Sequence, residues 1–266
     1  MVNRLSSIIL ILIFSISLCA CRSGKREVTV FAAKSLNSSL DEIISLYEAK
    51  NPSVDIVTNY DSSGTLVNQI LTGGAECDVF FSASESKVNE LEDNDLIVPG
   101  SDKVIINNQL CVVTYKGSDT RVTGLSNLDK AASLAIADAT VPIGEYTRKS
   151  LYKLGLISGI DISDTILSDE LGGVTINNCS NAGMVVAAIL EHANEVATVY
   201  YSDIAGHEDE LVVIEKVPYE ISGQITYPAA LLKNNKANDE AKSFFDYLSS
   251  DEAGDIFRKY NFTLEN

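Results

Sequence analysis

The sequence is poor in the residues on which metal, redox and nucleic-acid chemistry depend. Its 266 residues include no tryptophan, two histidines, two methionines and five cysteines, and no two cysteines form a Cys-x-x-Cys pair. Zinc sites rest on closely spaced cysteines and histidines, and disulfide frameworks rest on an even number of cysteines, so both lose support. Basic residues are scarce too, because 20 lysines and arginines stand against 37 acidic residues, for a net charge of −17. Nucleic acid needs clustered basic side chains, so no nucleic-acid partner is expected.

The first twenty residues differ from the rest of the chain. They carry a single charge and end in an apolar run of 13 residues, which is shorter than the roughly 20 that a helix needs to cross a bilayer. This pattern predicts a secretory signal peptide over residues 1–20, in preference to an uncleaved membrane anchor. The run closes with Leu18-Cys19-Ala20-Cys21, which resembles the bacterial lipobox. The resemblance implies that Cys21 carries a lipid, followed by a tether over 21–26, on the extracytoplasmic face of the cell membrane.

Three cysteines remain once the signal peptide and the lipidated residue are set aside: Cys77, Cys111 and Cys179. We expect Cys77 and Cys111 to pack as small apolar side chains in strands. An odd number cannot pair completely, and one disulfide among the three stays open as an alternative.

After residue 26 the chain alternates strand-like and helix-like segments, which predicts an α/β fold. Strand-like runs at 28–33, 54–60 and 77–84 are each followed by a turn and a helix-like segment, so the three strands should pair in parallel in one sheet. A second set of strands is predicted at 110–116, 133–138, 196–201 and 211–217, with helices at 145–155 and 184–193, and the chain ends with a strand from 224 and a long amphipathic helical region. No low-complexity linker separates the sets, which favours two lobes joined by short crossovers.

Small and hydroxyl residues recur where these strands give way to helices. Ser35 follows the first strand, just before a capping box predicted at Ser39–Glu42. Equivalent turns read Ser62-Ser63-Gly64-Thr65, Val141-Pro142-Ile143-Gly144 and Asn181-Ala182-Gly183. Such residues cap helices everywhere, so any one turn says little. Ligands of parallel α/β sheets bind beyond the carboxyl ends of the strands, where helix N-termini present free N–H groups. The recurrence therefore indicates a donor-only cradle for an oxyanion.

The segments that carry these turns resemble the molybdate-binding proteins of ABC importers. They are VFAAKSL, NYDSSGTLVNQI, GAECDVFFSAS, ADATVPIGEYTRKSLYKLG, ATVYYSDIAG, ITYPAAL and FFDYLSSDEAGDIFRKYNF, colinear from about Val28 to Phe262. The resemblance implies a type II periplasmic-binding-protein fold, in which two α/β lobes with central mixed sheets are joined by two crossovers. The first lobe would comprise 27–108 plus 227–266, and the second 109–226.

The same resemblance implies a function and a set of ligand-binding residues. A monomeric solute-binding lipoprotein would capture molybdate, and tungstate with it, in the cleft between the lobes and deliver it to an ABC permease, without cofactor or catalysis. The hydroxyls of Ser35, Ser63 and Tyr200 and the backbone N–H groups of Ile143 and Ala182 would hold the oxyanion, with no protein atom bound to the metal itself.

Two positions depart from the family pattern. Lys34 replaces a frequent alanine, and we expect its side chain to point to solvent. Asn181-Ala182-Gly183 replaces Asn-Val-Arg, so the register of the Ala182 contact could slip by one residue.

The acidic composition does not oppose anion binding. Molybdate is a fully deprotonated dianion and offers only acceptors, which O–H and N–H donors match at roughly 1.5–3 kcal/mol for each hydrogen bond. Salt screens the distant charges of the protein within about 8 Å.

Three other interpretations stay open at this point. Another anion, such as sulfate, phosphate or an organic acid, could occupy the same cradle. Ser84-Glu85-Ser86-Lys87 matches the S-x-x-K pattern of serine acyl-transfer enzymes, with Ser84 and Lys87 as the reactive pair, although no S-D-N or K-T-G partner is present. A purely structural or adhesive lipoprotein would leave the cradle unexplained.

Overall fold

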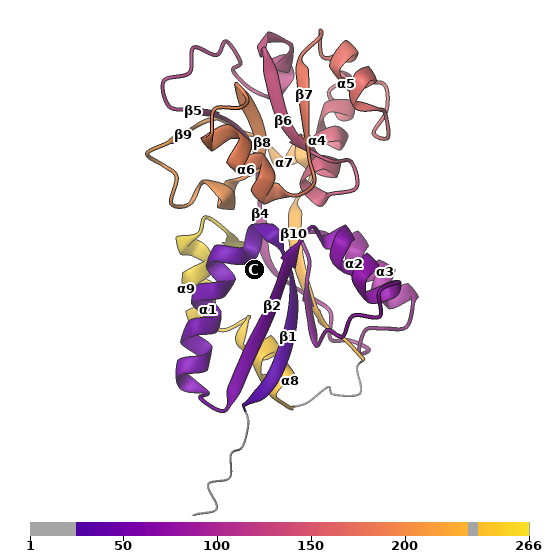
Figure 1. Ribbon diagram of the computed structural model, residues 1–266, viewed down its shortest axis with the longest axis vertical. Coiled ribbons are helices and arrows are strands. Elements are labelled where there is room, and N and C mark those ends of the chain that lie inside the picture. Colours follow the sequence, from indigo (N-terminus) through magenta and orange to yellow (C-terminus); the bar gives the residue numbers. More distant parts are fainter. Residues whose placement is uncertain (1–24, 234–238, 266) are drawn as a thin grey trace, which may run out of the picture.

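The computed structural model describes residues 25–233 and 239–265. The predicted signal peptide, the Cys21 lipidation site and most of the tether lie outside this part of the chain. The described residues form two sheets flanked by helices, stacked along the long axis of the molecule (Figure 1). Among the described residues, no helix is both long enough and apolar enough to cross a membrane.

The first lobe is built on a six-stranded mixed sheet with the strand order β11-β4-β10-β3-β1-β2. β1 pairs in parallel with β2 and with β3, which confirms the predicted parallel pairing. β10 runs antiparallel to β3 and β4, and β11 antiparallel to β4. The strands are β1 (Arg26–Ala33), β2 (Val54–Asp61), β3 (Val79–Phe81), β4 (Lys103–Asn108), β10 (Ile225–Leu231) and β11 (Thr263–Leu264).

Helices cover both faces of this sheet, because alternate residues of β1 are buried on opposite sides. Val28 and Val30 belong to the cluster under α1, α8 and α9, whereas Phe31 packs with Leu66 and Leu91 of α2 and α3. Figure 1 shows the two groups of helices on either side of β1 and β2. The helices of this lobe are η1 (Lys34–Leu36), α1 (Asn37–Lys50), α2 (Ser63–Leu71), α3 (Glu85–Asp93), α8 (Asp239–Tyr247) and α9 (Asp251–Lys259).

One local prediction for the first lobe is wrong, and a second gains detail. The capping box at Ser39–Glu42 is wrong, because the chain passes from β1 through η1 directly into α1 and Leu36 occupies the N-cap position. Ser39 lies buried inside the first turn, where its hydroxyl donates to the Leu36 carbonyl at 3.0 Å. The long C-terminal helical region divides into α8 and α9, because the Ser250 side chain accepts from the Ala253 N–H and starts a new helix.

The second lobe is built on a five-stranded mixed sheet with the order β7-β6-β8-β5-β9. β6 is parallel to β7 and β8, whereas β5 is antiparallel to β8 and β9. The strands are β5 (Leu110–Tyr115), β6 (Ser133–Ala137), β7 (Thr175–Cys179), β8 (Val196–Tyr200) and β9 (Leu211–Lys216). The helices are η2 (Leu125–Lys130), α4 (Pro142–Lys153), α5 (Asp164–Glu170), α6 (Ala182–Leu190), η3 (Tyr201–Ile204) and α7 (Tyr219–Ser222).

The chain crosses between the sheets at two places. β4 ends in the first sheet at Asn108 and β5 begins in the second at Leu110, so the first crossover is nearly immediate. The return runs from β9 through α7 to β10. Figure 1 shows β4 and β10 side by side at the waist between the lobes. The connections at the waist are therefore few, which is the arrangement that lets two lobes hinge about a ligand.

The cysteines pack as apolar side chains. Cys111 in β5 and Cys179 at the end of β7 are buried free thiols. Burial raises the pKa of Cys111 to about 12, so the thiol stays protonated. Cys77 is buried as well, but it lies two residues before β3, with its Sγ 3.2 Å from the Val79 carbonyl oxygen.

We expect the C-terminal return to be essential for the stability of the first lobe. Phe257 of α9 is fully buried and packs edge-on against Phe81 and Phe262, with ring centroids 6.1 and 5.9 Å away. Phe257→Ala should lower the free energy of unfolding by about 3–5 kcal/mol, as for other buried phenylalanines. Chemical denaturation measures the loss. Tyr152→Ala, at a side chain that is 52% exposed, should change stability little. An equal effect of the two changes would contradict the assigned packing.

Candidate functional site

A small cavity lies between the lobes, where strand ends of both sheets meet. Four of the five predicted ligand-binding residues line it, namely Ser35, Ser63, Ala182 and Tyr200. The fifth, Ile143, is not among the lining residues. The complete lining is Ala33, Lys34, Ser35, Ser62, Ser63 and Ala83 from the first lobe, and Val141, Pro142, Ala182 and Tyr200 from the second.

Ser63 is placed as a hydrogen-bond donor toward the cavity. It is the first residue of α2 and is 1% exposed. Its Oγ accepts from the backbone N–H of Ala83 at 3.1 Å, so its own proton remains available. The neighbouring Ser62 serves the helix instead, because its side chain accepts from the Thr65 N–H at 3.1 Å as the N-cap.

Ser35 lies in η1, directly after β1, and its hydroxyl contacts a tyrosine from the far end of the sequence. Its Oγ lies 2.8 Å from the Oη of Tyr227, which is fully buried in β10. Tyr227 belongs to the segment ITYPAAL, and the sequence pattern assigns it no contact with the ligand. Only the pairing of β10 into the first sheet brings this side chain next to η1.

Tyr200 presents a buried hydroxyl that makes no hydrogen bond of normal geometry in the described part of the chain, although the Tyr227 hydroxyl lies near enough to affect its pKa. The residue ends β8, is 1% exposed, and its Oη has no hydrogen-bond partner there. Burial raises the pKa of Tyr200 well above its ordinary value, so the group stays protonated and can donate. An unsatisfied buried polar group costs about 1–3 kcal/mol. An acceptor in the cavity would remove this cost.

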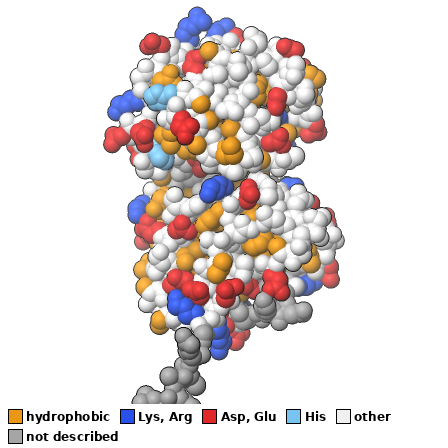
Figure 2. Space-filling model, in the orientation of Figure 1, with side chains coloured by type: hydrophobic (Ala, Val, Ile, Leu, Met, Phe, Trp, Pro, Cys, Tyr) orange, Lys and Arg blue, Asp and Glu red, His pale blue; other side chains and the backbone are white. Residues whose placement is uncertain are grey.

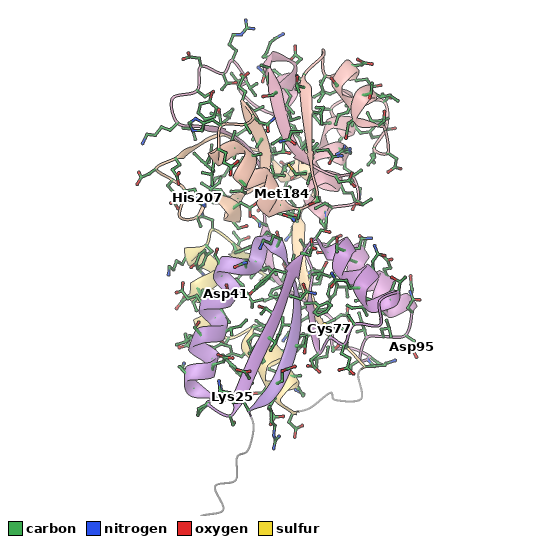
Figure 3. All side chains as sticks on the ribbon, viewed as in Figure 1. Lys25, Asp41, Cys77, Asp95, Met184 and His207 are labelled. Atoms are coloured by element: carbon green, nitrogen blue, oxygen red, sulfur yellow. The ribbon has the colours of Figure 1, made fainter. Side chains whose placement is uncertain are left out.

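Two helices of the second lobe begin at the cavity. In α6 the Asn181 side chain accepts from the Met184 N–H at 3.0 Å, so this cap does not bind the N–H groups of Ala182 and Gly183. In α4 Pro142 is the first residue and has no N–H, which makes Ile143 the first possible donor of that helix. Helix N-termini attract anions through these groups and the helix dipole. Figure 3 places Met184 of α6 at the edge of the second lobe that faces the first.

Gly144 fixes how closely α4 approaches β6. A Cβ at this position would lie 2.1 Å from the carbonyl oxygen of Asp138 and 2.3 Å from that of Ala137. No side chain fits there, because both neighbours are backbone atoms. The glycine of the Val-Pro-x-Gly turn therefore has a packing role: it seats the start of α4 on the end of β6.

The sequence predicts that the Lys34 side chain points to solvent, and the structure corrects this expectation. The side chain is half-buried and lies across the cleft against the second lobe. A Cβ on Gly183 would be 3.2 Å from its Cγ and 3.3 Å from its Cε. Its Nζ lies 6.0 Å from the centre of the Tyr60 ring. The stem of Lys34 thus fills the space that a larger residue at position 183 would need.

Beside the cavity, a second pocket between the lobes contains a carboxyl group with an unusual pKa. Asp203 lines this pocket together with Lys34 and His207. Its Oδ2 accepts from the Tyr200 backbone N–H at 3.0 Å. Burial raises the pKa of Asp203 to about 7, although the hydrogen bond from Tyr200 opposes the shift.

The alternative serine site is not assembled. Ser84 Oγ pairs with Ser86 Oγ at 2.9 Å, and Lys87 Nζ forms an ion pair with Glu90 at 2.9 Å. The amine is therefore engaged with a carboxylate instead of the hydroxyl that it would have to activate. Neither Ser84 nor Lys87 lines the cavity.

Figure 2 shows acidic side chains spread over both lobes, and basic side chains at the two ends of the molecule as well as at the waist. No group of three or more His, Cys, Asp or Glu side chains that could hold a metal ion occurs within the described residues. The polar groups that face the cavity are hydroxyls and helix N–H groups, together with the lysine at its rim.

Comparison with known proteins places this arrangement in context. A family described as bacterial extracellular solute-binding protein matches residues 28–263. YvgL of Bacillus subtilis, named as an ABC transporter substrate-binding lipoprotein, is 33% identical over 242 residues, covering 91% of this chain and 88% of that protein. The molybdate-binding protein ModA of Escherichia coli is 28% identical over 247 residues, covering 90% of each chain.

The fold has a counterpart among solved structures. A structure named for the substrate-binding domain of a molybdenum ABC transporter from Clostridium difficile superimposes with a TM-score of 0.66 at 28% identity, covering 90% of this chain and 99% of that one. The two mixed sheets and their flanking helices form a type II periplasmic-binding-protein fold, which confirms the predicted fold class.

The raised pKa of Asp203 predicts how stability depends on pH. The folded-state pKa of about 7 lies above the ordinary value of 3.8, so between these values the folded protein binds more protons than the unfolded chain. The contribution of Asp203 to the free energy of unfolding is therefore fully present below pH 3.8 and is lost as the pH rises through about 7. We expect the melting temperature to fall from about pH 5 to 8, and to fall less in Asp203→Asn. Parallel pH profiles of the two proteins, followed by thermal melts, would refute the assignment.

Proposed function

The chain belongs to the family of bacterial extracellular solute-binding proteins, and from this premise we propose that it captures molybdate, and tungstate with it, for an ABC permease. It is a substrate-binding protein of an ABC transporter, as its relatives are, and not an enzyme. The proposed site is the interlobe cavity, with Ser35, Ser63 and Tyr200 donating through hydroxyls and Ile143 and Ala182 through backbone N–H groups.

One observation carries the proposal: three hydroxyls from the two lobes line the cavity, and those of Ser63 and Tyr200 are left with a proton to donate. Ser63 already accepts from Ala83, Ser35 is hydrogen-bonded to Tyr227, and the buried Tyr200 hydroxyl has no partner among the described residues. Molybdate offers four oxygens that can only accept. A ligand of this kind can accept from all three hydroxyls at once, whereas an apolar or cationic ligand would leave the Tyr200 hydroxyl unpaired and the Ser63 proton without an acceptor.

The charge of the ligand is met by dipoles instead of by a countercharge. Hydrogen bonds to a charged partner are worth about 1.5–3 kcal/mol each, and two helix N-termini add their favourable potential. The lobes enclose the ligand and exclude the water that would weaken these bonds.

Competing anions differ from molybdate in two properties. Hydrogen phosphate carries a proton and would oppose a donor with a donor. Sulfate has the same charge and the same acceptors, but it is smaller, so the width of the cavity has to separate it from molybdate. The names of the relatives support molybdate over sulfate.

We also propose that the protein is held at the extracytoplasmic face of the membrane by a lipid on Cys21, and that it acts as a monomer. The lipobox-like segment and the naming of the Bacillus subtilis relative as a lipoprotein support the anchor. The predicted lobes, 27–108 plus 227–266 and 109–226, are proposed as the units that close over the ligand.

Removing single hydroxyls should weaken molybdate binding. Ser35→Ala, Ser63→Ala and Tyr200→Phe in residues 22–266 should each raise the dissociation constant by roughly fivefold or more, the equivalent of about 1 kcal/mol for one hydrogen bond. Isothermal titration calorimetry against molybdate, tungstate, sulfate and phosphate measures the effect and the selectivity. Ser45→Ala, an exposed serine on α1, is the matched control.

Wild-type affinity in both serine variants would remove these residues from the site. A folded wild-type protein that gives no heat and no melting shift with any of the four anions would remove the proposed function itself.

Closure of the lobes should depend on Gly64. A Cβ on this residue of the first lobe would lie 3.2 Å from the Thr140 carbonyl oxygen of the second, closer than ordinary van der Waals contact. Gly64→Ala should therefore weaken molybdate binding by several-fold, while the melting temperature without ligand stays the same or rises, because alanine favours the α2 helix. Gly159→Ala, where the nearest atom is a side-chain methyl at 3.4 Å, should leave binding unchanged. Equal affinities of the two variants would show that this contact does not limit closure.

A further inference from the structure

Two buried polar residues at the waist connect the cavity to the crossovers, and neither lines it. Asn108 is the last residue of β4, at the first crossover, and is 2% exposed. Tyr227 lies in β10, after the second crossover, and is fully buried. Asn108 is hydrogen-bonded to Tyr227, and Tyr227 is hydrogen-bonded to Ser35.

The orientation of the Asn108 amide is determined by its neighbours. Its Oδ1 accepts from the backbone N–H of Gln109 at 2.9 Å and from that of Ser202 at 3.3 Å. Backbone N–H groups can only donate, so the atom that faces them has to be the oxygen. The other atom of the amide is then Nδ2, which can only donate.

The donor at Nδ2 determines the direction of the next hydrogen bond. Nδ2 donates to the Ser202 hydroxyl at 2.8 Å and to Tyr227 Oη at 3.2 Å. Because Tyr227 accepts from Asn108, its own proton is free for another acceptor. Ser35 Oγ, at 2.8 Å, is the partner that the geometry offers. Burial raises the pKa of Tyr227, so this proton is retained.

The Ser35 hydroxyl has a single proton. When its oxygen accepts from Tyr227, this proton makes no hydrogen bond within the described part of the chain and can point into the cavity. Ser63 reaches the same state by accepting from the Ala83 N–H. The two serines thus present donors for the same reason, one through a backbone amide and the other through a side-chain relay.

We propose that Tyr227 is a positioning residue that, aligned by Asn108, holds the Ser35 hydroxyl as a donor and thereby selects fully deprotonated tetrahedral oxyanions over protonated ones. Tyr227 does not touch the ligand and acts through Ser35 alone. The inference rests on the proposed function, since it concerns how the same cavity recognises its anion.

A double-mutant cycle tests the relay. Isothermal titration calorimetry with molybdate is carried out on the wild type, Tyr227→Phe, Ser35→Ala and the double variant. Tyr227→Phe should raise the dissociation constant roughly fivefold to tenfold, as expected for a typical hydrogen bond. In the Ser35→Ala background the same change should have no further effect, because the residue through which it acts is absent. Tyr47→Phe, at a buried tyrosine of α1 that packs on Phe244, controls for loss of a buried hydroxyl elsewhere in the first lobe.

Selectivity provides a second readout, which a general loss of packing would not change. With Tyr227→Phe the Ser35 hydroxyl is free to turn and accept, so the ratio of molybdate to hydrogen phosphate affinity should decrease. A structural defect would weaken both anions to the same extent. Should Tyr227→Phe not fold, Asn108→Asp replaces it in the cycle. The carboxylate would accept a hydrogen bond from the Tyr227 hydroxyl in place of Ser35, and the part of its effect that passes through Ser35 should vanish in the Ser35→Ala background.

The possible outcomes separate the two proposals. Additive losses, an unchanged selectivity ratio or tighter binding in Tyr227→Phe would overturn the relay while leaving the function in place; tighter binding would mean that Ser35 donates to Tyr227. A folded wild type that binds none of the tested anions would overturn the function and the relay together.

Discussion

The proposed function depends on one constraint at the cavity: its hydroxyls have to be donors. A hydroxyl can either donate a hydrogen bond to a ligand or accept one from it. When another group of the protein already donates to the hydroxyl oxygen, the hydroxyl proton is left for the ligand. The Ala83 backbone does so for Ser63, and Tyr227 is the candidate for Ser35. Tyr200 has no internal partner in the described chain, and its raised pKa keeps the proton in place. Much of the surrounding architecture can be understood as support for these three groups.

The topology explains why the donors come from both lobes. Parallel strands end at one edge of their sheet, and the helices that follow begin there, so each sheet directs its turns and helix N-termini to the waist. The first lobe contributes turns after β1, β2 and β3, and the second contributes turns after β6, β7 and β8. The chain crosses only at β4–β5 and at β9–β10, which leaves the halves of the site on bodies that can move. Gly64 against Thr140 and Lys34 against Gly183 are two of the places where the lobes contact one another.

The sequence predicts most of the strands because their signals are local, but it misses β4, β7 and β11. Runs of apolar residues mark β1, β5, β6 and β8, and the parallel pairing of β1 with β2 and β3 follows from the intervening helices. The recurring turns point to Ser35, Ser63 and Ala182, and the family resemblance adds Tyr200; the structure brings all four to one cavity. Their role toward a ligand stays a prediction. The start of α1 was misplaced because η1 continues the chain into the helix, and no residue pattern marks that continuation.

What sequence could not provide is the set of contacts between distant segments. Tyr227 and Ser35 are separated by 192 positions, and their hydroxyls meet only because β10 returns to the first sheet. Asn108 looks like one of two equivalent asparagines at the end of β4, yet its neighbour Asn107 instead donates to the Glu265 side chain at 2.5 Å. The difference arises from side-chain alternation along β4, which directs one amide toward the waist and the other toward the C-terminal edge. A site that recognises an anion by hydrogen-bond donors alone therefore depends on neutral groups brought together from distant segments. The number of charged residues in the sequence does not indicate such a site.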